Sequence, residues 1–311
     1  MIELEHATNK YGAVTGLQDV TLRIGRGETV GLLGRNGAGN TTALNLITGY
    51  FPPTEGVVRI GGKGMLEHAR ECRRMIGYLP ERPPLYDEMT VEDYLRFVCE
   101  LREVRPKGIR AHVDDILGLC GLTEMRRRVL GHLSKGYRQR AGIAQALCGS
   151  PEILVFDEPT VGLDPKQTVE IRELIRHLQA DHTVVFSSHI LGEVQQLCSR
   201  VIILDRSRMV RDYDCGRPET DGLRVRVRIA GDGGRAMKRL AHLDPDIRAE
   251  AAPCPEDGMT EALLTVPGGG DPGAGIDRIF RLLADSGLPV RMMKEERETL
   301  EEVFLRETDR E

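Results

Sequence analysis

The stretch GLLGRNGAGNTTALNLITG, from Gly31 to Gly49, decides the fold class of this chain. From Gly34 to Thr41 it follows the pattern G-x-x-x-x-G-K-[ST] of phosphate-binding loops, except that Asn40 stands where the pattern has lysine. The apolar run TVGLLG before the loop indicates a strand, and an apolar helix is expected from about Thr41. Because strand, loop and helix follow one another, the pattern predicts a phosphate site rather than a glycine-rich turn without a ligand.

Three physical features suit this loop to the phosphates of a magnesium-bound nucleotide. Its glycines permit backbone conformations that point successive N–H groups at one ligand. The N-terminus of the following helix directs its dipole at the same place, and the hydroxyl of Thr41 can bind Mg²⁺. We therefore predict a nucleotide-binding segment made of Gly34, Arg35, Asn36, Gly37, Ala38, Gly39, Asn40, Thr41 and Thr42.

Two adjacent carboxylates follow an apolar run in the segment ILVFDEPT. Asp157 and Glu158 are expected at the C-terminal edge of a buried strand, which is where α/β sheets bind ligands. One carboxylate can hold the hydration shell of magnesium, while the other orients or deprotonates a water molecule.

Further motifs come in a fixed order around these carboxylates. In HLSKGYRQR, Ser134 is placed at the start of a helix, another terminus that favours anions. The segments VGLDP and VVFSSHI follow, and the latter contains His189. A lone histidine is more often structural than catalytic, but five motifs in order over about 160 residues are hard to obtain by chance.

Asparagine at position 40 is expected to weaken both nucleotide binding and hydrolysis. Lysine would place a positive charge on the phosphates, whereas the amide of Asn40 is neutral and has a shorter stem. A hydrogen bond to a charged group contributes about 1.5–3 kcal/mol, so its loss corresponds to about a ten- to hundredfold loss of affinity. Asn40 can be a natural feature of a degenerate subunit, an introduced inactivating change or a sequence variant. The intact Asp157, Glu158 and His189 favour a recent or deliberate lesion.

Composition narrows the class of protein. The chain has 311 residues, a net charge of −5 and no long basic run, which argues against a dedicated nucleic-acid binder. Its apolar runs are far shorter than the roughly 20 residues of a membrane span, and its N-terminus does not resemble a signal peptide. The seven cysteines are odd in number and never spaced as CxxC, so we expect reduced thiols in a cytosolic protein rather than a metal site.

The chain changes character after about Gly216. Before it, short apolar runs alternate with helical stretches, and a more helical block spans about 83–150. After it, GLRVRVRIAGDGG alternates apolar residues with arginines, which predicts a half-exposed strand or, less simply, a basic binding face. We then expect a helix near RAMKRLAHL, strands near DIRAEA and EALLTV, a loop PGGGDPGAG, a helix GIDRIFRLLADSG, a strand PVRMMK and a final helix with a Thr299–Glu302 capping box. This order suggests a small split βαβ domain.

Taken together, the motifs between Met1 and Gly216 resemble the ATP-binding subunit of an ABC transporter. The resemblance implies an α/β fold, namely a P-loop NTPase ABC ATPase domain over residues 1–216 with an inserted helical subdomain at about 83–150. Residues 217–311 would then form a small α+β C-terminal domain that resembles a ferredoxin-like split βαβ unit.

The same resemblance implies roles for individual residues. Tyr11 would stack on adenine, Glu158 would be the catalytic base, and His189 would contact the γ-phosphate. Thr41, Asp157 and Glu81 would serve magnesium, with Glu81 at a position where the family has glutamine. The family's LSGGQ segment, which acts on ATP bound to the opposite subunit, corresponds here to Ser134, Lys135, Gly136 and Tyr137, and Asp164 would lie at the dimer seam.

The resemblance also implies partners and a place in the cell. The family works as a dimer with two ATP molecules at its interface, so this chain would need a second ATP-binding subunit, identical or related. The forms GYLPE, LSKGYRQR and LEEVFLRET resemble bacterial ABC-2-type exporters, including the gliding-motility-related group. Such a subunit would bind ATP and Mg²⁺ and drive an ABC-2-type transmembrane permease from the cytoplasmic face of the inner membrane. Its coupling surface would be the loop after Glu81 and the helical block from Tyr86 to Arg102.

Two other functions stay open from the sequence. One is a regulatory ABC subunit that binds nucleotide with little or no turnover, which the loss of the lysine would suit. The other is an ABC-type ATPase acting on DNA or ribosomes, a class that usually carries coiled-coil inserts or tandem cassettes. Neither feature is found in this sequence.

Overall fold

The computed structural model describes residues 1–215, 222–230, 246–252, 258–267, 272–287, 289–296 and 299–308. The chain divides into two compact units, one of Met1–Gly216 with Glu307–Glu311 and one of Arg217–Arg306.

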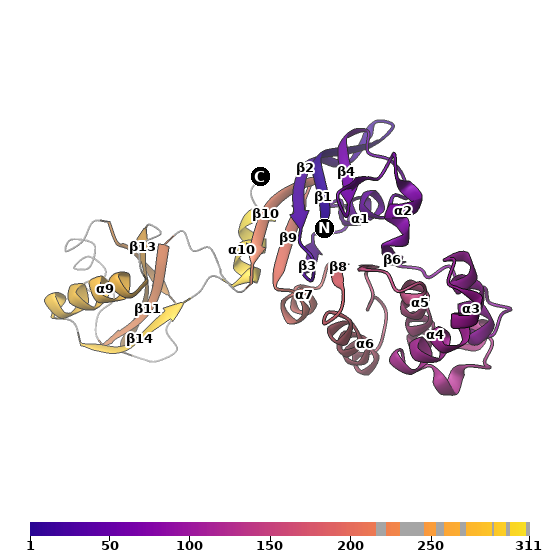
Figure 1. The fold of residues 1–311 in the computed structure, drawn as a ribbon. Helices are drawn as coiled ribbons and strands as arrows, with labels where there is room; N and C mark the ends of the chain where they lie inside the picture. Colours follow the sequence, from indigo (N-terminus) through magenta and orange to yellow (C-terminus); the bar gives the residue numbers. More distant parts are fainter. Residues whose placement is uncertain are drawn as a thin grey trace. The chain divides into compact units, whose positions relative to one another are not determined.

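A sheet of six strands forms the centre of the first unit (Figure 1). Its order is β10-β9-β3-β8-β7-β6, and all neighbours are parallel except β10 and β9. All residues of β7 and β8 are buried, as the apolar runs predict for parallel strands covered on both faces. The strands are β3 (Thr29–Leu33), β6 (Ile76–Leu79), β7 (Ile153–Asp157), β8 (Thr183–Ser188), β9 (Arg200–Asp205) and β10 (Arg208–Asp214).

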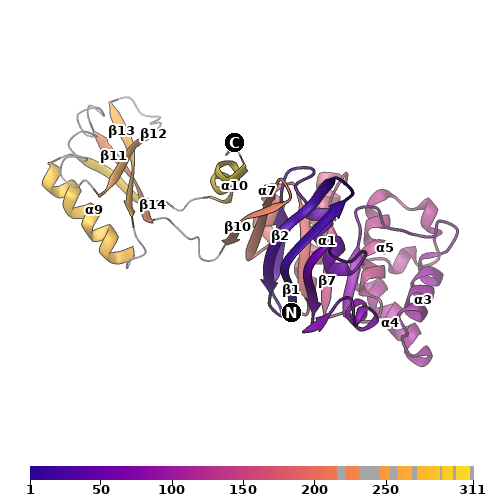
Figure 2. The ribbon, with the colours of Figure 1, turned by 90° about the horizontal axis from the view of Figure 1, so that it is seen from above.

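A second, antiparallel sheet has the order β2-β1-β4-β5, and helix α1 contacts strands of both sheets (Figure 2). One apolar core joins the inner faces of the two sheets through α1, with Leu44, Leu46 and Ile47 fully buried. Because α1 follows the glycine-rich loop directly, this core fixes the loop in place. The elements are β1 (Ile2–Tyr11), β2 (Val14–Ile24), β4 (Glu55–Ile60), β5 (Lys63–Gly64) and α1 (Asn40–Thr48).

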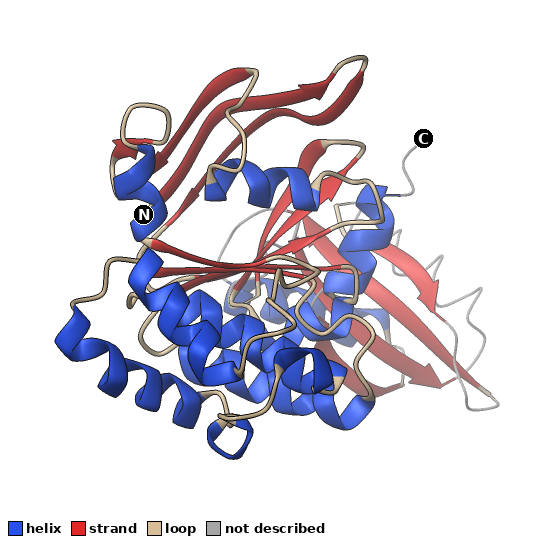
Figure 3. Cartoon of the chain, turned by 90° about the vertical axis from the view of Figure 1, so that its right-hand side faces the viewer, coloured by secondary structure: helices blue, strands red, loops and turns tan. Residues whose placement is uncertain are grey.

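Figure 3 shows the helices of the chain in blue, and those of the predicted helical block are labelled α3, α4 and α5 in Figure 1. Helix α5 lies close against β6. The approach is so close that a Cβ atom on Gly77 would come within 2.0 Å of the carbonyl oxygen of Ala146. Glycine at position 77 therefore permits the block to dock on the sheet. The helices between α1 and the second unit are α2 (Ala69–Arg74), α3 (Val91–Leu101), α4 (Pro106–Leu119), α5 (Lys135–Leu147), α6 (Pro165–Leu178) and α7 (Leu191–Leu197), with short 3-10 turns η1 (Thr123–Met125) and η2 (Leu130–His132).

The second unit contains an antiparallel sheet of order β12-β13-β11-β14, and α9 packs on β11 and β13. The predicted helix near RAMKRLAHL lies outside the described residues. The predicted loop PGGGDPGAG was wrong in its last part, because α9 already begins at Pro272. Proline is well tolerated in the first turn of a helix, where its missing N–H has no partner to lose. The elements are β11 (Gly222–Ala230), β12 (Arg248–Ala252), β13 (Met259–Pro267), α9 (Pro272–Ser286) and β14 (Val290–Glu296). The last helix, α10 (Leu300–Thr308), includes the boundary between Arg306 of the second unit and Glu307 of the first.

Strand β11 is half-exposed, as its alternation predicts. Val225, Val227 and Ile229 are buried in the core of the second unit. On the other face, Arg226 donates to Glu296 at 2.6 Å, and both Arg226 and Arg228 pair with Glu261. Carboxylates of the same unit take up these guanidinium groups, which favours the half-exposed strand over a basic binding face.

Two smaller predictions are also confirmed. Thr299 and Glu302 exchange hydrogen bonds between side chain and backbone at 3.0 and 3.2 Å, which is the expected capping box of α10. The described cysteines are free thiols.

In the described part of the chain, none of the helices combines the length and apolar character needed to span a bilayer.

The core of the first unit supplies a stability prediction. Phe156 is the residue before the last one of β7, and none of it is exposed. We expect Phe156→Ala to lower the free energy of unfolding by about 3–5 kcal/mol through lost burial and the cavity left behind. Phe280→Ala is the control, because this side chain is 64% exposed and its loss should cost less than about 0.5 kcal/mol. Urea unfolding of both variants measures the difference, and equal losses would contradict the assignment of this core.

Candidate functional site

One pocket of the first unit, with a volume of about 510 Å³, gathers most of the predicted site residues. We call it the phosphate-loop pocket. It is bordered by the glycine-rich loop, by the C-terminal edge of β7 and β8, by the end of β1 and by the start of β2. The predicted residues that line it are Tyr11, Gly34, Arg35, Asn36, Gly37, Ala38, Gly39, Asn40, Thr41, Thr42, Glu81, Asp157, Glu158 and His189.

The backbone of the loop has the form that a phosphate cradle requires. Gly37 and Gly39 have φ values of 82° and 111°, which side chains other than glycine adopt rarely. A Cβ atom on Gly39 would also lie 2.8 Å from the carbonyl oxygen of Gly16. Helix α1 begins directly after Gly39, so the N–H groups of its first turn face the same side as the loop.

The side chain of Asn40 is turned toward its own loop. Its Nδ2 atom lies 3.5 Å from the carbonyl oxygen of Gly34, which is a long hydrogen bond. Its Oδ1 atom is buried and has no hydrogen-bond partner. The amide therefore leaves an unsatisfied acceptor in the loop and contributes no positive charge to the cradle.

The two carboxylates stand at the C-terminal end of β7. Asp157 is 2% exposed and accepts a hydrogen bond of 2.6 Å from the hydroxyl of Ser187. Burial raises the pKa of Asp157, and hydrogen bonds from Ser187 and Thr41 act in the opposite direction. Glu158 has a positive φ of 48°, which is a strained conformation of the kind often found at functional sites. Its backbone N–H donates to the same Ser187 hydroxyl at 3.0 Å.

His189 contacts Glu158 directly. Its Nδ1 atom lies 3.0 Å from both carboxylate oxygens of Glu158. Burial raises the pKa of Glu158, and the hydrogen bond and charge of His189 partly offset this effect. The two residues meet because β7 and β8 are parallel neighbours and each residue follows its strand at the same edge of the sheet.

Tyr11 lies at the outer end of the pocket. Its side chain is 48% exposed and stands edge-on to Phe51, with ring centroids 5.5 Å apart. Its hydroxyl lies 3.5 Å from Oγ1 of Thr42. An exposed ring beside the loop can accept a stacked base, so the role of Tyr11 stays a prediction.

The signature-type residues lie elsewhere in the same unit. Ser134, Gly136, Tyr137 and Asp164 line a separate pocket of about 380 Å³, and Lys135 follows Ser134 at the start of α5. Ser134 caps α5 by accepting from the backbone of Tyr137, and Asp164 caps α6 at 2.8 Å. One chain thus does not bring these residues to its own phosphate loop.

Sequence reasoning missed several contributors to the site. Val14, Thr15, Gly16 and Val161 also line the phosphate-loop pocket, and Ser187 ties both carboxylates together. Ser187 could have been found from its place directly before Ser188 and His189 at the end of an apolar strand. Gly16 gave no signal, because its closeness to the loop depends on the packing of β2.

The donor set fits magnesium better than a transition metal. In the part of the chain that the structure describes, no group of three His, Cys, Asp or Glu side chains could hold a metal ion. Mg²⁺ instead prefers oxygen ligands, keeps several waters and binds through one or two carboxylates together with phosphates. Thr41, Asp157 and Glu81 supply such oxygens around one pocket.

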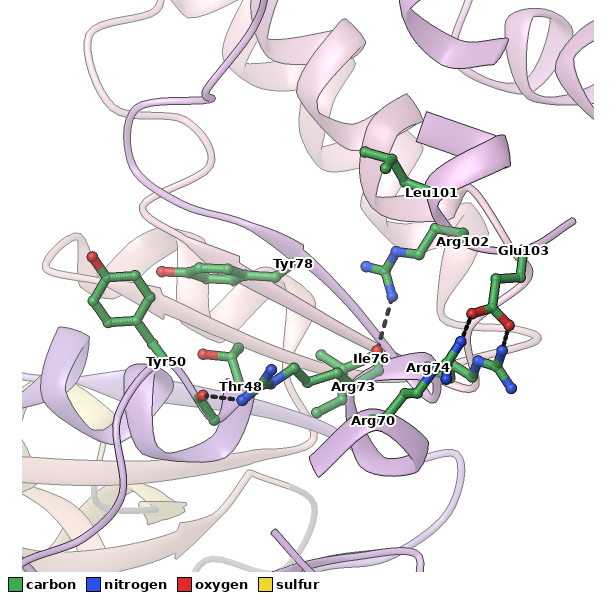
Figure 4. Close-up of a pocket in the computed structure, with 11 residues that line it drawn as sticks. Thr48, Tyr50, Arg70, Arg73, Arg74, Ile76, Tyr78, Leu101, Arg102 and Glu103 are labelled. Atoms are coloured by element: carbon green, nitrogen blue, oxygen red, sulfur yellow. Dashed lines mark hydrogen bonds and ion pairs between the residues drawn. The ribbon is translucent and has the colours of Figure 1, made fainter. Parts of the chain in front are cut away.

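A second cavity of the first unit, about 590 Å³ in volume, is markedly basic (Figure 4). Arg70 and Arg74 turn toward Glu103, whereas Arg73 and Arg102 donate to backbone carbonyl oxygens. We call it the arginine pocket. Its lining is Thr48, Gly49, Tyr50, Arg70, Arg73, Arg74, Ile76, Tyr78, Leu101, Arg102 and Glu103.

Comparisons with known proteins agree with this geometry. A family profile described as ABC transporter matches residues 17–161. The ABC transporter ATP-binding protein NatA of Bacillus subtilis is 38% identical over 204 residues, which are 65% of this chain and 83% of NatA. The daunorubicin resistance ATP-binding protein DrrA3 of Streptomyces coeruleorubidus is 30% identical over 313 residues, covering 98% of this chain and 94% of DrrA3.

A solved structure gives the same result for the fold. The ATP-binding cassette MJ0796, as a dimer in a post-hydrolysis state with ADP and Pi, aligns with a TM-score of 0.63 and 27% identity. The alignment covers 69% of this chain and 99% of MJ0796. The expected fold class, a P-loop ABC ATPase fold, is therefore confirmed. By its sequence relatives, its fold and its phosphate-loop pocket, this chain belongs to the family of ABC transporter ATP-binding proteins.

Proposed function

We propose that this chain is the ATP-binding and hydrolysing subunit of a bacterial ABC exporter whose membrane-spanning subunits are separate chains. The observation that carries the proposal is the phosphate-loop pocket. It brings a glycine-rich loop, two carboxylates and a histidine together from distant parts of the sequence. The names of NatA and DrrA3, an ABC transporter protein and a drug-resistance protein, support a role in transport.

In this proposal different pocket residues bind the phosphates, the adenine base and the magnesium ion of ATP. The loop from Gly34 to Thr42 cradles the phosphates, and Tyr11 stacks on adenine. Bound magnesium neutralises phosphate charge, and Thr41, Asp157 and Glu81 would hold it.

The catalytic step in this proposal uses the pair at the end of β7 and β8. Glu158 accepts a proton from the attacking water, and His189 moves from Glu158 to the γ-phosphate when ATP binds. Burial of Glu158 raises its pKa and so increases its basicity toward water.

The separate pocket at α5 and α6 supports a dimer. Two helix N-termini, capped by Ser134 and Asp164, meet there and favour an anion. A Cβ atom on Gly136 would lie 2.7 Å from Cδ of Gln167, so glycine lets the two termini approach. We propose that Ser134, Lys135, Gly136 and Tyr137 contact ATP held by a second subunit, with Asp164 at the seam. That subunit is either a second copy or a related chain.

We propose an ATPase domain at 1–216, with its helical subdomain at about 83–150, and a C-terminal domain at 217–311. The two compact units divide the chain at the same place, except that Glu307–Glu311 belongs to the first unit. The strand order β12-β13-β11-β14, with antiparallel pairing throughout, is the order of a ferredoxin-like split βαβ unit and supports that assignment. The match to DrrA3 over 98% of this chain extends through this domain.

The arginine pocket is the site where we propose that the membrane partner binds. It includes the end of the block from Tyr86 to Arg102, and its lining holds four arginines but a single glutamate. We propose that an ABC-2-type permease inserts a segment with acidic side chains here. The subunit would then sit on the cytoplasmic face of the inner membrane.

This contact gives a prediction. Reversing one charge, Arg73→Glu, should reduce co-purification of the permease about tenfold or more, because like charges at an interface are strongly unfavourable. Arg26→Glu is the control, since Arg26 is highly exposed and does not line the pocket. Affinity purification from detergent-solubilised membranes measures the effect. Equal recovery with both variants would remove the arginine pocket from the contact.

The test of the function itself combines two measurements. Mg-ATP binding and hydrolysis are measured for the chain and for Asn40→Lys, and proteins retained from membranes are identified. Turnover together with a retained multi-span protein supports the exporter. The alternative, a regulatory subunit, is supported by nucleotide binding without turnover even after lysine is restored. Retention on ribosomes or DNA without a membrane protein would contradict both.

A further inference from the structure

A buried glutamate lies directly behind the catalytic pair. Glu193 belongs to α7 and is 5% exposed. The hydroxyl of Thr160 donates to its Oε2 atom at 2.7 Å, and the hydroxyl of Ser188 donates to the same atom at 2.9 Å. Glu193 is not among the residues that line the phosphate-loop pocket. The carboxyl group is thus held inside the protein by two hydroxyl donors and outside the lining of the phosphate-loop pocket.

The two hydroxyls come from the two segments that carry the catalytic pair. Thr160 belongs to the tight turn that follows Glu158, in which the N–H of Val161 donates to the carbonyl of Glu158 at 3.2 Å. Ser188 ends β8 and directly precedes His189. The same Ser188 hydroxyl accepts the N–H of Ile190 at 3.0 Å, which fixes the backbone on both sides of the histidine.

We infer that Glu193 is a positioning residue that holds the Glu158 turn and the His189 segment in register through Thr160 and Ser188. The inference rests on the proposed ATPase function, because only hydrolysis requires Glu158 and His189 at a defined separation. Glu193 does not line the phosphate-loop pocket, and it acts through the two hydroxyl groups. It acts by holding the two backbone segments that carry the pair, so that His189 returns to its 3.0 Å contact with Glu158 after each cycle.

The geometry allows the hydrogen bonds that Glu193 accepts to be tested separately from the charge of a carboxylate. Because both hydroxyls donate to one oxygen, the side-chain carbonyl of glutamine can accept both bonds in the same place. Glu193→Gln should therefore keep the positioning, whereas Glu193→Ala removes both bonds. Thr160→Val keeps the side-chain shape and removes only one bond.

The experiment uses the full chain with Asn40→Lys. Misplacement of catalytic groups by about 1 Å can cost about 100-fold in rate, so we expect Glu193→Ala to lower kcat about 10- to 100-fold. Glu193→Gln should stay within about threefold of the parent, and Thr160→Val should fall between them. The Kd for Mg-ATP should stay unchanged in all three, because Glu193 and Thr160 lie outside the pocket lining. Glu173→Gln, an exposed glutamate on α6, is the matched control.

A second readout needs no turnover. Amide hydrogen exchange of residues 158–163 and 188–192 should become faster in Glu193→Ala and stay unchanged in Glu193→Gln and Glu173→Gln. Equal losses of kcat in the glutamine and alanine variants would overturn the inference, as would normal kcat or unchanged exchange in Glu193→Ala. If Asn40→Lys itself shows no hydrolysis, the proposed function fails, and hydrogen exchange still decides whether Glu193 ties the two segments together. If the alanine variant does not fold, Thr160→Val carries the same test.

Discussion

Asn40→Lys is expected to raise the affinity for Mg-ATP about ten- to a hundredfold and to raise kcat by at least as much. The reason lies in the charge at the cradle. The amide of Asn40 faces the carbonyl of Gly34 and leaves its own oxygen unsatisfied. An ammonium at this position would be attracted to the phosphates, and its attraction grows as charge develops on the same oxygens in the transition state.

A matched control separates the position of the charge from its presence. Asn45→Lys adds the same charge on the same helix, but Asn45 does not line the phosphate-loop pocket. Asn40→Gln adds length without charge. Neither should raise affinity or turnover more than about threefold, on the scale of a long-range charge effect screened by salt. Equilibrium dialysis with Mg-ATP and phosphate release measure the two quantities. High turnover of the chain with Asn40 unchanged would refute the expectation that a lysine ammonium is needed for efficient hydrolysis.

Glu158→Gln, made in the Asn40→Lys background, is expected to lower kcat by about 10²- to 10⁴-fold while nucleotide still binds. Glutamine has nearly the same shape but cannot accept a proton from water at neutral pH. Its carbonyl oxygen can keep a hydrogen bond with His189, so the arrangement at the end of β7 should persist. The loss would thus report proton transfer rather than misfolding.

Glu152→Gln is the control for this change. Glu152 directly precedes β7 at its opposite end, where its exposed side chain pairs with Arg26. We expect normal turnover for this variant and an unchanged Kd for Mg-ATP in both. A Glu158→Gln chain that hydrolyses ATP at more than about a tenth of the parent rate would exclude Glu158 as general base. Loss of binding together with turnover would show that Glu158 serves the nucleotide in another way.

Local chemistry explains why much of the fold could be predicted. The runs ILVFD and TVVFSS are wholly buried strands, and their apolar character alone indicated cover on both faces. Ser134 caps α5, as predicted, because its side-chain oxygen can accept from the first turn, and this depends on a few neighbouring residues. Boundaries were less certain, as the start of α9 at Pro272 shows.

Only those residues of the candidate site that belong to a local sequence motif could be predicted. The glycine loop, the carboxylates after β7 and His189 each have a recognisable local pattern, and the pocket contains all of them. Glu193 has no such pattern, because its role arises from hydroxyl groups 33 and 5 residues away. The arginine pocket could not be predicted either, since its arginines come from α2 and from the residue that follows α3, which are distant in the sequence.

By itself the sequence determined several buried strands of the first unit, most elements of the C-terminal segment, where the phosphate loop lies and that the loop has Asn40 in place of lysine. These properties follow from periodicity, glycine conformations and side-chain chemistry within short windows. Only the tertiary structure decided that Glu158 adopts a positive φ beside His189, that Asn40 turns to Gly34, and that Ser134 lines a different pocket from the loop. The physical reason is that such contacts depend on the packing of strands far apart in the chain, which no local pattern encodes.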